Sequence, residues 1–178
     1  MNHGIHYDTH KLLDVFKRHY LSVLSGLTGD KPRSYGFEYE FLPARPLTIE
    51  DVTAVGRCLT EKGYTPRKKA FIHPDIGMCV DFEPGGQIEY CSPPLQGGED
   101  DAFYQLMALI QRTNAQIKSD LGIEYIGTDF MPERGGAPLC LTSERYQQLH
   151  ERLSRVGSRG LEMMKGTASI HLHVVISN

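Results

Sequence analysis

Residues 33–42 read RSYGFEYEFL, a strand-like stretch with two glutamates at its centre. Side chains alternate between the two faces of a β-strand, so residues two positions apart share a face. In a predicted strand over residues 34–42, Glu38 and Glu40 therefore lie on one face, and aromatic residues occupy the other. Because neighbouring carboxylates repel each other, this pair requires either open solvent or a positively charged partner.

A predicted hairpin repeats this arrangement in the middle of the chain. Strands at about residues 77–83 and 86–92 are joined by a Pro-Gly-Gly turn, a short connection typical of β-hairpins. In the second strand Gln87 and Glu89 share one face, and Glu83 enters from the first strand. The hairpin therefore carries two further carboxylates beside a polar face.

The last predicted strand, at about residues 167–176, has a histidine face. In SIHLHVVIS, His171 and His173 lie on one side of the strand. We expect the opposite, apolar side to pack on helices, as the apolar faces of the other strands do. That side consists of Ile170, Leu172, Val174 and Ile176.

Helical spacing of apolar residues separates these strands. It predicts helices at about residues 8–27, 48–63 and 100–121 and from Thr142 or Ser143 onward, with a further strand at 123–130. Hairpin-paired strands interrupted by helices of unequal length predict an α+β fold, with an antiparallel or mixed sheet and helices packed on one face. No linker divides the chain, so we expect residues 1–178 to form a single domain.

Composition excludes several classes of function. The chain of 178 residues is 40% apolar and carries a formal net charge of −3, which offers no basic field for nucleic acid. No apolar run has the roughly 18 residues of a membrane span, and the first residues lack the pattern of a signal peptide. We therefore expect a cytoplasmic protein with no nucleic-acid or membrane partner.

The polar faces of the three strands have two interpretations. They are either the solvated side of an ordinary antiparallel sheet, or they converge their glutamates and histidines on one cleft. A cluster of carboxylates is unfavourable without a cation, and oxygen ligands with an occasional imidazole suit Mg²⁺ or Mn²⁺. Periodicity alone does not show that the strands are neighbours, so both interpretations stay open at this point.

Three motifs in order resemble a known family. GFEYEF, EPGGQIEY and MMKGTASIHLHV are similar to the glutamate–cysteine ligase family of the plant and bacterial kind, a branch of the glutamine synthetase superfamily. The segment SERYQQLHERLSRVGSRGLEMMKGTAS is similar as well, and the likeness extends from about residue 34 to the end. The resemblance implies a curved sheet that forms half of a glutamine-synthetase-like catalytic barrel, as the N-terminal half of a ligase-like catalytic domain.

The activity that the resemblance implies is ATP-dependent carboxylate–amine ligation. In that family ATP phosphorylates the side-chain carboxyl of a glutamate-like amino acid, and an amine substrate then displaces phosphate from the acyl phosphate. By likeness of motifs His173 would contact nucleotide phosphate, although HxH is closer to glutamine synthetases than to the ligases. The residues that would bind Mg²⁺ or Mn²⁺ by the same likeness are Glu38, Glu40, Glu83, Glu89 and His171.

An alternative function follows from the length of the family's members. They continue well beyond this strand, and their later half supplies a further metal glutamate and the arginines that bind substrates. We therefore expect either a complementing C-terminal half or a homo-oligomer. The alternative is a non-catalytic module derived from the same fold, which binds a metal or small ligand or pairs with another chain through its last strand.

Overall fold

The computed structural model describes residues 34–97, 100–157 and 159–174, together with Asp14 and Arg18. Apart from these last two residues, the helix expected at 8–27 lies outside the described residues, as does Ile176.

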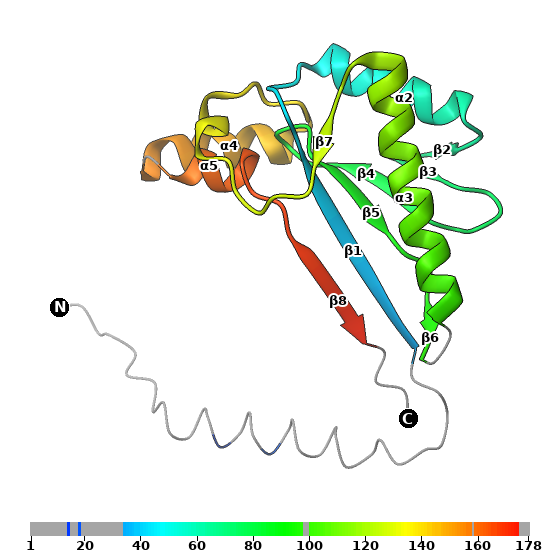
Figure 1. Cartoon of the computed structure of the whole chain (residues 1–178). Coiled ribbons are helices and arrows are strands. Elements are labelled where there is room, and N and C mark those ends of the chain that lie inside the picture. Colours follow the sequence, from blue (N-terminus) through cyan, green and yellow to red (C-terminus); the bar gives the residue numbers. More distant parts are fainter. Residues whose placement is uncertain (1–13, 15–17, 19–33, 98–99, 158, 175–178) are drawn as a thin grey trace.

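One antiparallel sheet of eight strands organises the described part of the chain (Figure 1). Its path runs β2-β3-β4-β5-β1, and β6, β7 and β8 also pair with β1, which is the longest strand. The prediction of an α+β fold with an antiparallel sheet is confirmed. The strands are β1 (Ser34–Pro43), β2 (Thr65–Arg67), β3 (Ala70–Ile72), β4 (Cys79–Phe82), β5 (Ile88–Cys91), β6 (Leu95–Gln96), β7 (Tyr125–Ile126) and β8 (Ile170–Val174).

One of the predicted helices, α2, begins at a capping box. The N-cap residue of α2, Thr48, accepts a hydrogen bond at Oγ1 from the Asp51 amide at 3.2 Å, and the Asp51 carboxylate accepts one from the Thr48 amide at 3.0 Å. Gly63 follows α2 with φ +92°, a conformation that favours glycine. The helices are α2 (Ile49–Glu61), α3 (Asp100–Leu121), α4 (Glu144–Val156) and α5 (Gly160–Lys165), with a 3₁₀ helix η1 (Pro132–Gly136).

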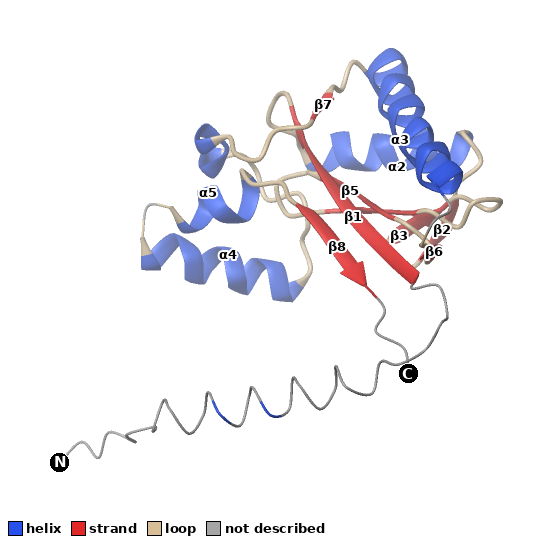
Figure 2. Ribbon diagram, turned by 60° about the horizontal axis from the view of Figure 1, so that its bottom comes forward, coloured by secondary structure: helices blue, strands red, loops and turns tan. Residues whose placement is uncertain are grey.

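Two helices, α2 and α3, cover one face of the sheet (Figure 2). The aromatic side of β1 points into this layer, where Phe37 is buried and packs edge-to-face on Phe103 of α3, with ring centroids 5.7 Å apart. Tyr90 of β5 is fully buried, and its hydroxyl donates to Asn114 Oδ1 at 2.6 Å. Because the core lies on this side, the alternate residues of β1, β4 and β5 face the other way.

Three differences from the sequence-based expectations concern short or peripheral elements. The strand expected over 123–130 is only two residues long, and β2, β3 and β6 were not expected, because strands of two or three residues leave no recognisable alternation. The short helices η1 and α5 were also not expected. Leu149 of α4 is 37% exposed, because α4 packs mainly on α5.

The apolar side of β8 was expected to pack on helices, and that expectation is wrong. Ile170 and Leu172 are each 66% exposed and Val174 is 48% exposed. The described helices that cover this face of the sheet lie over the other strands and do not extend across β8 (Figures 1 and 2).

Candidate functional site

The strand register places three carboxylates in one row across the sheet. Glu40 of β1 lies opposite Glu89 of β5, and Glu89 lies opposite Asp81 of β4. Directly paired residues of antiparallel strands point to the same face, about 4.5–5.5 Å apart at Cβ. Glu40, Glu89 and Asp81 therefore line the face that α2 and α3 leave open.

A second row on the same face contains Glu38 and His171. Glu38 lies opposite Cys91 of β5 on one side and opposite His171 of β8 on the other. His173, two residues along β8, lies opposite Gly36 and shares this face. The structure thus brings the polar sides of β1, β5 and β8 together on one face. This is the arrangement required if their glutamates and histidines converge.

Both histidines contact the Glu38 carboxylate. His171 Nδ1 lies 3.0 Å and His173 Nε2 3.3 Å from Glu38 Oε2. The hydrogen bond with His171 is the main reason that the pKa of Glu38 is lowered from its ordinary value, and His173 acts in the same direction. Glu38 is therefore ionised at neutral pH and links β8 to β1 through side chains.

The backbone of the segment leading into β8 holds Glu40. The Ser169 amide donates to Glu40 Oε2 at 2.9 Å, and the Glu40 amide donates to the Ser169 carbonyl at 3.0 Å. These two bonds fix the start of β8 against β1. They also leave the second oxygen of the Glu40 carboxylate free of any hydrogen bond to the described residues.

Glu83 and Glu89 are half-buried carboxyls, and the charge of Glu89 acts on Glu83. Burial, together with the charges of Glu89, Glu40 and Asp81, raises the pKa of Glu83 from 4.5 to about 7. Burial also raises the pKa of Glu89, whose Oε1 accepts a hydrogen bond from the Cys91 thiol at 3.2 Å. Burial is the largest cause of both shifts, and the charges of neighbouring carboxylates add to it.

The β4–β5 turn positions these acids and is itself anchored to α5. Gly86 has φ +82°, and its amide donates to the Glu83 carbonyl at 2.9 Å. Gln87 was expected on the polar face beside Glu89, but it is buried, with 2% of its surface exposed. Its Oε1 accepts from the Gly85 amide at 2.7 Å, and its Nε2 donates to the Thr167 carbonyl at 3.1 Å. Gln87 is therefore a structural residue that closes one end of the open face.

A pocket of about 720 Å³ adjoins the carboxylate row. Asp81 contributes to both, and Lys69 and Arg145 bring positive charge to the pocket from the β2–β3 turn and the first turn of α4. Lys69 partly offsets the burial that raises the pKa of Asp81, and Arg145 does the same for Glu83. Sequence reasoning missed Asp81, although it precedes Glu83 by two residues and so shares its face.

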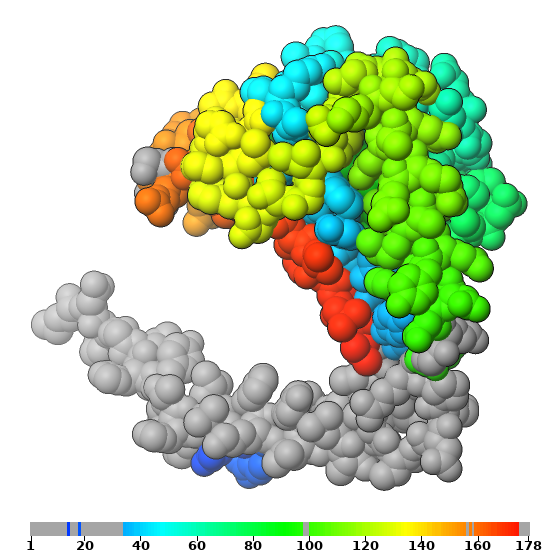
Figure 3. Space-filling view, viewed as in Figure 1, coloured from blue at the N-terminus to red at the C-terminus, as the bar shows by residue number. Residues whose placement is uncertain are grey.

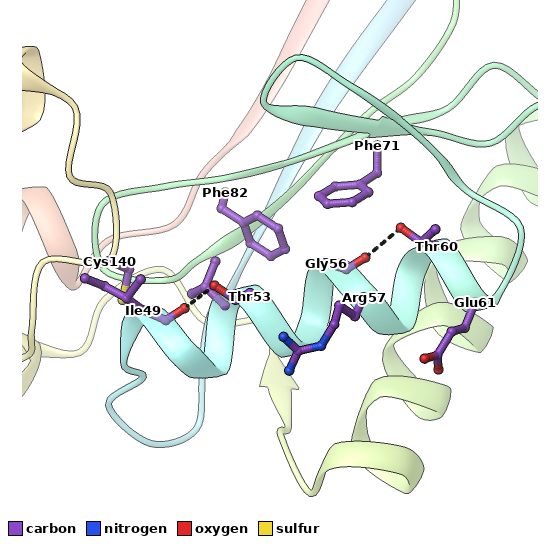
Figure 4. A pocket seen from close by; sticks show the side chains of 10 residues that line it. Ile49, Thr53, Gly56, Arg57, Thr60, Glu61, Phe71, Phe82 and Cys140 are labelled. Atoms are coloured by element: carbon purple, nitrogen blue, oxygen red, sulfur yellow. Dashed lines mark hydrogen bonds between the residues drawn. The ribbon is translucent and has the colours of Figure 1, made fainter.

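A second pocket, of about 510 Å³, lies on the other side of β4, between α2 and β3 (Figure 4). Phe71 and Phe82 form its floor, and Gly56 of α2 leaves room for the Phe71 ring. Neither Asp81 nor any glutamate of the two rows lines it. This groove is mainly apolar, and it shares Phe82 and Cys140 with the pocket beside the carboxylate row.

The side chains on the open face are of the types that bind divalent cations, but they are not arranged around one point. Carboxylates and imidazoles are oxygen and nitrogen ligands of the kind that Mg²⁺ and Mn²⁺ take, and burial together with neighbouring carboxylates raises the pKa of Glu83. Among the residues that the structure describes, however, no three His, Cys, Asp or Glu side chains surround a single point as metal ligands do. Side-chain rotation would have to complete such a site.

Comparison with known proteins points to one family. The family model described as glutamate-cysteine ligase family 2 (GCS2) matches residues 34–178. The chloroplastic glutamate–cysteine ligase of Nicotiana tabacum is 26% identical over 159 residues, which cover 84% of this chain and 29% of that protein. Those of Medicago truncatula and Arabidopsis thaliana are 27% and 25% identical over 160 residues, 84% of this chain and 30% and 29% of theirs. The chain spans about three tenths of the length of these relatives.

The names of these relatives correct the expected location. All three are chloroplastic proteins, so the cytoplasmic location expected from the sequence is wrong by this comparison. That expectation rested on the pattern of the first residues, which is no guide to the compartment of a chain that matches only part of its relatives. None of the helices within the described residues is long and apolar enough to cross a membrane.

Proposed function

Because the chain belongs to glutamate-cysteine ligase family 2, we propose that it forms the metal- and nucleotide-binding side of an ATP-dependent carboxylate–amine ligase. The observation that carries this proposal is the continuous row of Glu40, Glu89 and Asp81 across three strands. The solvated side of an ordinary sheet mixes charges and does not favour acids directly opposite each other, because they repel. We further propose that residues 1–178 form one domain, equivalent to the N-terminal half of a ligase catalytic domain.

The proposed ligands lie on the open face or at its rim. Glu38, Glu40, Glu89 and His171 lie on that face by register, and Glu83 lies beside it at the β4–β5 turn. These five residues would hold Mg²⁺ or Mn²⁺, with His173 directed to nucleotide phosphate. When bound, the cation would neutralise charge on the phosphates of ATP. The contacts of Glu38 and Glu40 with β8 would keep both carboxylates in place before the cation arrives.

The pocket beside the row suits the anionic groups of the substrates. We propose that Arg145 and Lys69 pair with a phosphate or with the carboxylate of a glutamate-like amino acid, because arginine and lysine are the usual partners of such groups. The half-buried carboxyl of Asp81 in the same pocket would accept hydrogen bonds from a substrate amine.

Calorimetry with a metal and a non-hydrolysable ATP analogue tests the proposal. Mn²⁺ and the analogue should bind the wild-type chain with saturable heat, and Glu40→Gln should weaken binding at least tenfold, or about 1.4 kcal/mol. Glu61→Gln is the matched control, since Glu61 is the last residue of α2 and belongs to neither row, so this variant should bind as the wild type does. Identical isotherms for wild type and Glu40→Gln would contradict the assignment.

Turnover separates the enzyme from the non-catalytic alternative. Phosphate release from ATP that depends on glutamate and an amine, and that Glu40→Gln abolishes, would exclude a purely binding module. Binding in the calorimeter without any such release would favour the alternative, a module that retains the metal face without completing the reaction.

A further inference from the structure

Lys165, at the end of α5, is a buried lysine without an acidic partner. It is only 2% exposed, and its Nζ donates a hydrogen bond to the Ala137 carbonyl at 2.5 Å. The same Nζ lies 3.4 Å from Nε2 of His150. Among the described residues, no carboxylate lies within ion-pair distance of Lys165 or His150. A buried ammonium without an opposite charge is costly, so it depends on these two hydrogen-bond acceptors.

The two contacts of Lys165 join three elements. Ala137 follows η1, His150 lies on α4, and Lys165 is the last residue of α5. The three elements pack on one another, and Figure 3 shows η1 (yellow) against α4 and α5 (orange). Between Ala137 and His150 the chain forms a wall of the pocket beside the carboxylate row, at residues 140–146. One side chain therefore holds both ends of the segment that contains this pocket wall.

The contact between the two side chains requires a neutral His150. An ammonium nitrogen only donates hydrogen bonds, so Nε2 of His150 has to be the acceptor, and the proton of the neutral ring has to lie on Nδ1. Burial and the charge of Lys165 both lower the pKa of His150, which favours this neutral form. A proton taken up at Nε2 removes the acceptor and leaves two cations 3.4 Å apart.

Within the described residues of the packed elements, no other charge offsets this repulsion. Apart from Lys165, no side chain there changes the pKa of His150, and Cys140 alone opposes the effect of burial on the pKa of Lys165. The remaining charged side chains of α4, α5 and η1 are exposed, apart from those named next. The other titratable or charged residues of this region that are not exposed are Arg134, Cys140, Tyr146 and Glu162.

We propose that the His150–Lys165 contact is a pH-sensitive switch, which holds α4 and the pocket wall against α5 and breaks when His150 takes up a proton from solvent. The proton binds Nε2, the atom that accepts from Lys165 while the ring is neutral. Once the contact is broken, α4 loosens from α5, and Arg145 in its first turn moves with it. All contacts of the switch lie within residues 137–165, and the proposal holds whether or not the chain is a ligase.

The direction of the pH effect follows from the pKa of His150. Its pKa is lower in the folded protein than the ordinary value of 6.5, so the unfolded chain takes up this proton first as the pH falls. The stability that the neutral ring contributes is therefore present above pH 6.5 and is lost as the pH falls through the lower value of the folded protein. The contact should be intact at pH 8 and weakened at pH 5.

Hydrogen exchange at pH 8 and pH 5 tests whether α4 loosens. After correction for the intrinsic effect of pH on exchange, protection of the α4 amides should fall at least about tenfold at pH 5, because partly buried cations at this distance repel strongly. In His150→Gln the side-chain carbonyl accepts from Lys165 at either pH, so protection should not change. The matched control is Arg152→Gln, an exposed residue of α4, which should lose protection as the wild type does.

Nuclear magnetic resonance of the imidazole tests the contact itself. At pH 8 the nitrogen shifts of His150 should place the proton on Nδ1, with Nε2 as an acceptor. Lys165→Met keeps a long apolar side chain and removes the cation, so it should raise the pKa of His150 towards the ordinary value. Should Lys165→Met fail to fold, the wild-type tautomer and the exchange of His150→Gln still decide the matter.

Four outcomes would overturn the proposal. Two concern α4, namely equal protection of the wild type at pH 8 and pH 5, or a loss at pH 5 that His150→Gln shares. The other two concern the ring, namely a proton on Nε2 of His150 at pH 8, or a pKa of His150 that is unchanged in a folded Lys165→Met variant.

Discussion

The fold changes the ionisation of Glu83 at neutral pH. Its pKa is raised from 4.5 to about 7, so the folded protein favours the protonated form. The stability that this group contributes is fully present below pH 4.5 and is lost as the pH rises through 7. Without divalent cations at pH 8, Glu83→Gln should therefore be more stable than the wild type and unfold at higher urea. The gain in free energy of unfolding should be about 1 kcal/mol, after allowing for solvent screening of a half-buried group.

At pH 5 the same substitution should change stability little, because the wild-type carboxyl is then protonated in the folded protein. Urea denaturation of both proteins at the two pH values measures the difference. A gain of the same size at pH 5 and pH 8 would show that the effect comes from packing and not from charge.

The alternation of side chains between the two faces of a strand predicted most residues of the candidate site. Glu38, Glu40, Glu89 and His171 were expected on shared polar faces, and the structure places them on one face. Asp81 follows the same alternation, two residues before Glu83, but its place in the row depends on its pairing with Glu89, which only the register shows. The sequence could not show which strands are neighbours, and the metal-binding role of these residues stays a prediction.

At the scale of elements, the β4–β5 hairpin and α5 form one unit through Gln87. The Gln87 side chain accepts a hydrogen bond from the Gly85 amide within the hairpin. It donates to the carbonyls of Met164 and Thr167, at the end of α5 and just after it. Removing the buried amide leaves these backbone groups without partners, which costs about 1–3 kcal/mol of stability. Gln87→Ala should therefore lower the free energy of unfolding by that amount, measured by urea denaturation.

The control for Gln87→Ala is Gln105→Ala on the exposed side of α3, which should stay within about 0.5 kcal/mol of wild type. If both variants unfold at the same urea concentration, the anchoring role assigned to Gln87 is incorrect.

Elements with strong local signals were predicted well, and those set by long-range contacts were not. The Thr48 and Asp51 capping pair marks the start of α2, and apolar spacing marks α3, because both signals lie within one segment. Burial of Gln87 depends on where α5 docks, about 80 positions away in sequence. The exposure of β8 likewise depends on which strands α2 and α3 cover, and no local pattern encodes that choice.

At the scale of the whole molecule, the sheet separates two surfaces with different chemistry. One side carries the aromatic residues and is covered by α2 and α3, and the other carries the acids and histidines of four strands. The α+β class and the antiparallel pairing were predictable, because hairpin spacing and alternation are local. The path of the sheet, with β1 between β5 and β8, was not predictable from the sequence and is what creates the candidate site.

In the proposed site, carboxylates of β1 and β5 and an imidazole of β8 meet around one cation. Pulsed electron paramagnetic resonance of Mn²⁺ bound to the chain measures this directly, because a coordinated imidazole produces a nitrogen coupling. The coupling should be present in the wild type, absent in His171→Gln, and unchanged in His150→Gln, whose histidine lies on α4. A bound Mn²⁺ without nitrogen coupling, or with the same coupling in His171→Gln, would contradict the account.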